Sequence, residues 1–148
     1  MSTAEEGSFS KAEREAMKER AREAKLEARR AKGENLKAQD LADVLDKFAK
    51  MVPADRAIAE KIHELVGKHA PQLDAKTWYG MPAYALEGKT ICFFQSGVAY
   101  KSRYCTFGFT DNAKLDDGEM WPTSFAISKL SPQVEAKIVE LLKQAVAA

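Results

Sequence analysis

Residues 75–95 read AKTWYGMPAYALEGKTICFFQ, and this stretch decides the fold class. It contains short runs rich in Thr, Ile, Tyr and Phe, residues that favour β-strands. Gly88 separates two of these runs and predicts a tight hairpin. Further strands are expected within residues 103–109 (RYCTFGF) and 123–127 (TSFAI). Strands that follow one another through short turns indicate an antiparallel sheet.

Helical periodicity flanks these strands on both sides. One apolar helical face is formed by Leu41, Val44, Leu45, Phe48 and Met51. A second helix is expected after Pro53, with an apolar face that runs from Ile58 to His69. A third begins at Ser131–Pro132, a capping residue followed by proline at the first helical position. We therefore predict an α+β fold in which helices pack on one side of an antiparallel β-sheet.

The N-terminal segment differs from the rest in charge. Residues 11–32 contain nine Lys or Arg and five Glu, whereas the whole chain has a net charge of only +1. Their Ala, Glu, Lys and Arg content favours a helix, which Ser10 can cap and Gly33 can end. Because this segment lacks the residues for a core of its own, we divide the chain into an N-terminal charged helical arm (1–35) and an α+β domain (36–148).

Composition excludes several classes of protein. At 148 residues and 45% hydrophobic content, the chain can bury a stable core without disulfides or a structural metal. Two Cys exclude a disulfide scaffold and a Cys₄ zinc site, and the distant positions of Cys92 and Cys105 lack the close cysteine pair of a Cys₂His₂ site. No apolar run is long enough to span a membrane, and the start MSTAEEGSF lacks a signal-peptide pattern. We expect a cytoplasmic protein without a membrane partner.

No catalytic motif is present. The sequence has no GxSxG elbow, no P-loop and no HExxH pair, so we expect no enzyme and assign no catalytic residue. Cys92 and Cys105 lie within predicted strands and are expected to be buried and inert. His69 is expected to interact with a helix C-terminus, and His63 to lie on the surface.

The segment from Trp78 to Pro82 is the most unusual part of the chain. Gly80 permits a positive φ or a close backbone approach, and Pro82 removes a sheet donor. Two interpretations stay open: a bent strand connection, or one wall of a ligand pocket that has aromatic faces and free backbone groups. Lys101 and Arg103 would offer contacts to an anion. The candidate ligand-binding residues are Trp78, Tyr79, Gly80, Met81, Pro82, Tyr84, Lys101 and Arg103.

A resemblance to a known family rests on the WYGMPAY stretch, the hairpin after Gly88, the SRYCTFGF strand and the C-terminal helix opened by Ser-Pro. In these features residues 36–147 resemble the YdhG-like domain family, most of which is catalogued as a domain of unknown function. The resemblance implies a small α+β fold with an antiparallel sheet. Because some members are described as frataxin-like iron chaperones, it also implies iron delivery without catalysis. The chain departs from the family in a shorter region between Phe94 and Tyr104 and in its basic arm.

The residues themselves give iron little support. Asp40, Asp43 and Asp46 share a helical face with lysines between them. A loop rich in carboxylates could hold a cation weakly; it contains Asp111, Asp116, Asp117 and Glu119. Neither group has an octahedral ligand pattern or the ligand spacing of an EF-hand loop, so we assign no metal ligands and no cofactor, and iron enters through the resemblance alone.

Three functions follow as hypotheses. The first is a small cytosolic, non-catalytic binding module of the YdhG-like family, with an unknown small ligand or protein partner. The second is a frataxin-like intracellular iron chaperone. The third is nonspecific binding of nucleic acid or an acidic partner by the basic arm. The arm residues considered for phosphate contacts are Arg14, Lys18, Arg22, Lys25 and Arg29.

Overall fold

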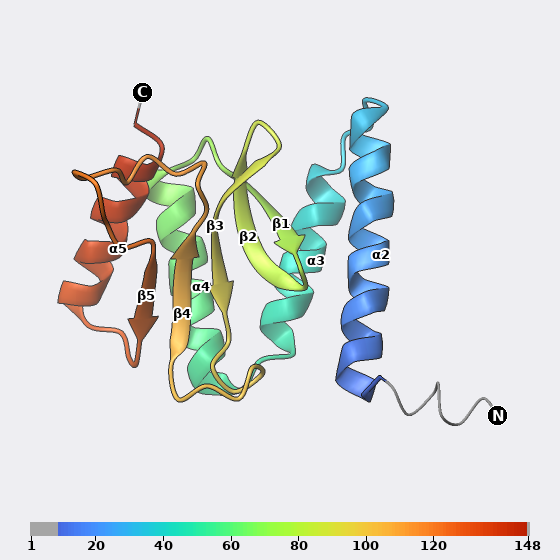
Figure 1. Cartoon of the computed structure of the whole chain (residues 1–148), viewed down its shortest axis with the longest axis horizontal. Coiled ribbons are helices and arrows are strands. Elements are labelled where there is room, and N and C mark those ends of the chain that lie inside the picture. The colour runs from blue at the N-terminus through green and yellow to red at the C-terminus, as the bar shows by residue number, and fades with distance from the viewer. Residues whose placement is uncertain (1–8, 148) are drawn as a thin grey trace.

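A computed structural model describes residues 9–147 and shows four helices and a five-stranded antiparallel sheet within them (Figure 1). The strands are β1 (Asp74–Trp78), β2 (Met81–Leu86), β3 (Lys89–Gln95), β4 (Cys105–Phe109) and β5 (Ser124–Ile127). They lie in the sheet in the order β1-β2-β3-β4-β5, so each strand pairs with its neighbour in sequence. The predicted antiparallel sheet is confirmed.

Two tight turns fix the register of the first three strands. Trp78 pairs with Met81 across the β1–β2 turn, and Leu86 pairs with Lys89 across the β2–β3 turn. Both central residues of each turn have positive φ. The values are 50° at Tyr79 and 77° at Gly80 in the first turn, and 51° at Glu87 and 85° at Gly88 in the second. This is the conformation of two-residue hairpins whose twist matches that of the strands. The hairpin predicted at Gly88 is confirmed.

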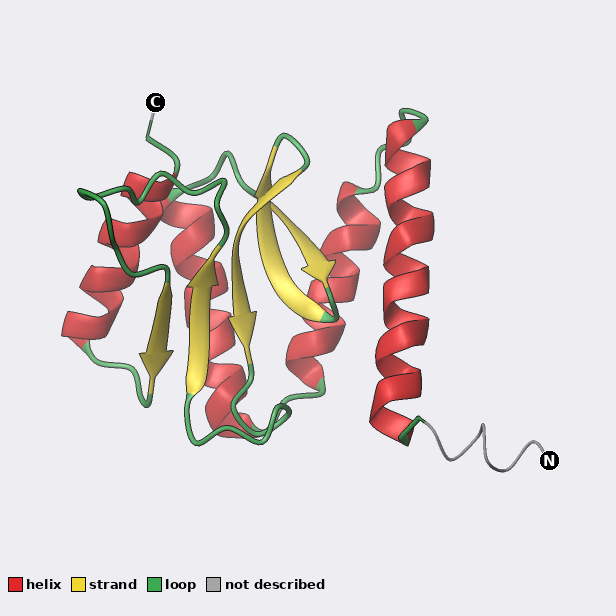
Figure 2. Cartoon of the chain, viewed as in Figure 1, coloured by secondary structure: helices red, strands yellow, loops and turns green. Residues whose placement is uncertain are grey.

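The helices are α2 (Lys11–Ala31), α3 (Lys37–Ala49), α4 (Pro53–His69) and α5 (Pro132–Ala145). Figure 2 shows α3, α4 and α5 behind the sheet, on one of its faces, and α2 beside α3 at the β1 edge. The predicted start of α5 is confirmed, whereas α4 begins at Pro53 itself instead of after it, and its N-cap residue Val52 makes no side-chain cap. Pro53 opens α4, and the Ser131 side chain accepts a hydrogen bond from the Val134 N–H at the start of α5.

The core lies between the sheet and these three helices. Strand residues alternate between the two faces of a sheet, and Tyr84, Phe94 and Phe107 all face the helices. From the helices the core receives Phe48, Ile62 and Leu142. All six side chains are fully buried. Both cysteines are buried as well, as predicted.

Two sequence expectations about the helical layer are wrong. Leu41 and Leu45 of the predicted apolar face remain 41% and 47% exposed. Helix α3 lies at the margin of the layer, where it packs on β1, β2 and α4 and forms ion pairs with α2. His63 is half-buried instead of lying on the surface, and its Nδ1 lies 3.0 Å from the Tyr84 hydroxyl oxygen.

The opposite face of the sheet has no described helix over it. Trp78 and Phe93 lie on this face with ring centroids 5.2 Å apart. The Phe93 ring covers Gly108 so closely that any side chain at Gly108 would collide with it. Glycine at this position therefore allows the aromatic pair to lie flat on the sheet.

Helix α2 is docked against the domain. Its first turn carries a capping box in which Ser10 and Glu13 satisfy each other's backbone N–H groups. Glu23 and Leu26 are its buried residues. The described helices are all too short or too polar to cross a bilayer.

Candidate functional site

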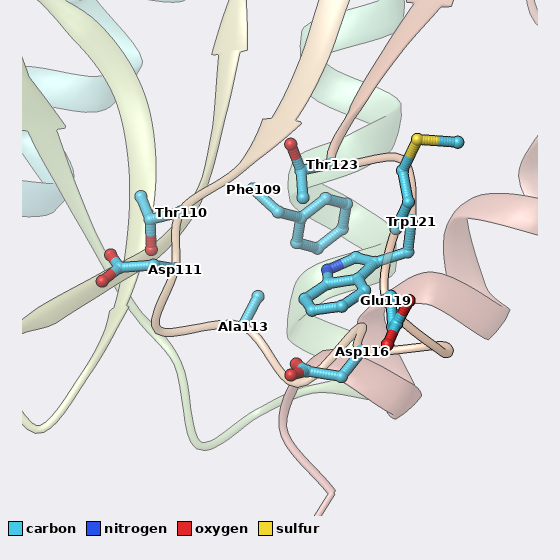
Figure 3. Close-up of a pocket in the computed structure, with 9 residues that line it drawn as sticks. Phe109, Thr110, Asp111, Ala113, Asp116, Glu119, Trp121 and Thr123 are labelled. Atoms are coloured by element: carbon cyan, nitrogen blue, oxygen red, sulfur yellow. The ribbon is translucent and has the colours of Figure 1, made fainter.

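A recess of about 550 Å³ opens where β4 ends and the chain enters the long loop toward β5 (Figure 3). Its lining residues come from the end of β4 and from this loop: Phe109, Thr110, Asp111, Ala113, Asp116, Glu119, Met120, Trp121 and Thr123. In Figure 3 the Trp121 indole lies across the recess, with Asp116 and Glu119 at one end and Asp111 at the other.

Backbone hydrogen bonds hold the loop that forms the recess. The Thr110 N–H donates to the Ile91 carbonyl on β3, and the Phe109 N–H donates to the Thr123 carbonyl across the mouth of the loop. The Lys114 N–H donates to the Ala145 carbonyl at the end of α5. These bonds join the loop to the sheet and to α5, so the recess has a defined shape although its walls are loop residues.

The charged residues that line the recess are all negative. Three of its lining residues are carboxylates, Asp111, Asp116 and Glu119, and none of the nine is Lys, Arg or His. No ion pair within residues 9–147 neutralises any of the three. The negative potential of the recess is therefore available to a ligand.

The donor set fits an organic cation better than a metal ion. The described residues contain no cluster of three His, Cys, Asp or Glu side chains close enough to hold a metal. Trp121 instead provides an indole face, the best aromatic surface for an ammonium or guanidinium group, and separate carboxylates provide acceptors around it. The iron chaperone hypothesis receives no ligand set from this part of the chain.

The Trp78–Pro82 segment, the predicted ligand wall, lies elsewhere and contacts α2. The carboxylate of Glu23 accepts the backbone N–H groups of Tyr79 and Gly80, each at 2.7 Å. The Arg20 guanidinium lies 4.7 Å from the centroid of the Tyr79 ring. Met81 and Pro82 continue directly into β2. The free backbone groups that sequence analysis expected at this bend are thus bonded to a carboxylate of the chain itself.

The remaining predicted ligand residues are distributed over different surfaces. Tyr84 points to the helical side of the sheet, opposite Trp78, and is 1% exposed. Burial raises the pKa of the Tyr84 phenol. Lys101 and Arg103 are exposed in the connection between β3 and β4, where Arg103 lies over the Tyr104 ring at 5.2 Å. The Trp78–Pro82 segment and Tyr84 therefore do not form one pocket.

A buried carboxylate anchors the β3–β4 connection. Asp55, at the start of α4, accepts hydrogen bonds from the Ser96 hydroxyl at 2.5 Å and the Val98 N–H at 3.1 Å. Burial alone would raise the pKa of Asp55, but these hydrogen bonds, with the Cys105 thiol, outweigh burial and hold that pKa below its ordinary value. Burial raises the pKa of the Cys105 thiol, so this cysteine is not an activated nucleophile.

The depressed pKa of Asp55 predicts a pH dependence. A carboxylate with a lowered folded pKa contributes stability above its unfolded pKa of about 3.9, and loses it as the pH falls through the folded value. We expect Asp55→Asn to lower the free energy of unfolding at pH 7 by about 1–3 kcal/mol. We also expect it to flatten the loss of stability below about pH 4. Urea unfolding at several pH values measures both effects, and an Asp55→Asn profile parallel to that of the wild type would contradict the assignment.

The carboxylates of this loop are evident in the sequence, whereas the recess is not. Phe109 lies in a predicted strand, and nothing in the spacing of Phe109 and Trp121 shows that the loop folds back to place a ring beside the carboxylates. The available signal is a tryptophan that closely follows the acidic residues at positions 111–119. In comparisons with known proteins, no family model, curated protein or solved structure matches this chain. The resemblance to YdhG-like domains stays a prediction.

Proposed function

We propose that the protein is a non-catalytic binding module and that the recess at Trp121 binds an organic cation, an ammonium or guanidinium group. The observation that carries this proposal is an indole face and three carboxylates that line one recess without any basic residue. Such a site attracts a cation by charge and selects a flat or alkylated one by contact with the ring.

The expected affinity is modest. A cation over an aromatic ring contributes about 0.5–2 kcal/mol, and each exposed carboxylate contributes about 0.2–1 kcal/mol. Together with apolar contact to Phe109 and Met120, and set against the loss of translational and rotational freedom on binding, this predicts a dissociation constant no tighter than about 1 mM. Because the carboxylates face solvent, binding should weaken as salt concentration rises.

Tryptophan fluorescence tests the proposal. The chain has two tryptophans, so the Trp78→Phe variant leaves Trp121 as the single reporter. We expect n-butylguanidinium chloride to change its emission saturably, with a midpoint of about 1 mM or above. The uncharged analogue n-butylurea has nearly the same shape and should produce no saturable change.

A variant that removes negative charge from the recess tests the same proposal. In the Trp78→Phe background, Asp116→Asn with Glu119→Gln should weaken n-butylguanidinium binding by about fivefold or more. The control pair Asp46→Asn and Glu60→Gln removes two exposed carboxylates from α3 and α4 and should leave the midpoint unchanged. Equal responses to n-butylurea and n-butylguanidinium, or equal effects of the two variant pairs, would refute the proposal.

A further inference from the structure

The charges of α2 are sorted by the face on which they lie. Toward the domain, Arg22 pairs with Asp43 at 2.8 Å, and Arg30 pairs with Asp40. The glutamates of this side are also occupied. Glu19 meets Lys47 at 3.4 Å, Glu27 meets Lys76 at 3.1 Å, and Glu23 binds the β1–β2 turn. Docking therefore occupies Glu19, Glu23 and Glu27 together with Arg22 and Arg30, whereas Glu15 stays exposed near the start of the helix.

The outer side of α2 keeps its cations unneutralised. Lys11, Lys18, Lys25 and Lys32 are all exposed, and none of them has an ion-pair partner within residues 9–147. We call these four residues the lysine row. Its members are seven residues apart, which is two helical turns with a drift of only ~20° per step. The row is thus nearly straight, with ~10.5 Å between successive lysines and a length of ~31 Å.

Of the arm cations considered for phosphate contacts, Arg14 donates a hydrogen bond to the Phe9 carbonyl at 3.0 Å. Arg22 is engaged with Asp43, and Arg29 forms hydrogen bonds with both carboxylate oxygens of Glu34 at 3.0 Å. Lys18 and Lys25 remain available, and Lys11 and Lys32 join them. Because Glu23 and Leu26 fix α2 against the domain, the row is held in place before any partner arrives, and less ordering is needed on binding.

We propose that the lysine row binds the phosphate backbone of duplex nucleic acid, without reading its sequence. A duplex presents one negative charge per ~1.7 Å of its axis, so a straight row of this length meets phosphates along its whole extent. Lysine supplies point charges without the planar, bidentate geometry that base recognition uses. A membrane surface fits less well, because the stripe beside the row consists of Met17, Ala21, Ala24 and Ala28 and lacks the bulky apolar residues of an interfacial helix.

Fluorescence anisotropy with a labelled 24-base-pair DNA of mixed sequence tests this proposal. Four phosphate contacts predict that log K falls with log salt with a slope of about −3 to −4. In the row variant, Lys11, Lys18, Lys25 and Lys32 are all changed to glutamine, which has a similar helix propensity. We expect this variant to bind at least about tenfold more weakly at low salt, with a flatter salt slope.

A charge-matched variant separates a local interface from net charge. The control changes Lys68, Lys89, Lys129 and Lys143 to glutamine; all four are exposed and lie outside α2. It alters the net charge equally and should change affinity by less than about threefold if the row is the contact surface. Equal weakening in both variants, or no binding by the wild type at low salt, would overturn the proposal. So would stronger row-dependent binding to poly-glutamate or to phosphatidylserine vesicles than to DNA, which would assign the row to an acidic polypeptide or a membrane.

Discussion

Replacing Phe107 with alanine is expected to lower the free energy of unfolding by about 3–5 kcal/mol. Phe107 is fully buried on β4, faces the helical layer, and packs edge-on against Phe109 with ring centroids 4.8 Å apart. Truncation removes the apolar contact and leaves a cavity between sheet and helices that the neighbours fill only in part. Because a domain of this size is stable by about 5–15 kcal/mol, the variant should be close to its unfolding limit.

Urea unfolding followed by circular dichroism measures this effect. Phe107→Leu keeps most of the volume and should cost less than about 1.5 kcal/mol. Val98→Ala, at a side chain that is 58% exposed, should change stability by less than about 0.5 kcal/mol. If Phe107→Ala were as harmless as Val98→Ala, the packing of the sheet against its helices would be described incorrectly.

Replacing Glu23 with alanine is expected to weaken the docking of α2 by about 2–4 kcal/mol. Glu23 is 4% exposed, and its two oxygens accept the N–H groups of Tyr79 and Gly80. Hydrogen bonds to a charged group contribute more than neutral ones, and alanine would leave both donors without a partner unless water enters. Since the rest of the α2 interface is mostly ion pairs, this loss should release the helix before the domain itself unfolds.

Amide hydrogen exchange distinguishes release of the helix from global unfolding. In Glu23→Ala the amides of Tyr79, Gly80 and the middle of α2 should exchange much faster, whereas those of β3 and β4 should keep their protection. The matched control is Glu15→Ala, an exposed glutamate on the same helix, which makes the same change in helix propensity. Similar exchange in the two variants would show that the carboxylate does not hold the turn.

Local chemistry predicted most of the fold. Ser10 and Gly33 mark the ends of the arm helix, Gly88 forms the predicted hairpin, and Ser131–Pro132 begins α5. These features depend on a few neighbouring residues and on backbone conformations that few residue types favour, so they are readable from one sequence. The exposure of Leu41 and Leu45 was not readable, because it depends on how far the sheet extends beneath α3.

The surfaces were less predictable than the elements. Glu23 is one of four glutamates on the same helical stripe, and its burial follows from the position of the Tyr79–Gly80 turn, which lies more than fifty residues away in sequence. The recess likewise depends on a loop that folds back across the end of β4. The carboxylates near Trp121 are visible in the sequence as a loop that could hold a cation weakly, but the position of an indole beside them is not.

A two-dimensional ¹H–¹⁵N NMR titration of the full chain with n-butylguanidinium chloride tests the cation site most directly. Saturable shifts should centre on residues 109–123 and include the indole N–H of Trp121, while n-butylurea should leave these resonances in place. Shifts centred instead on Trp78 and Phe93, or shifts that spread over all acidic surfaces without saturation, would contradict the account.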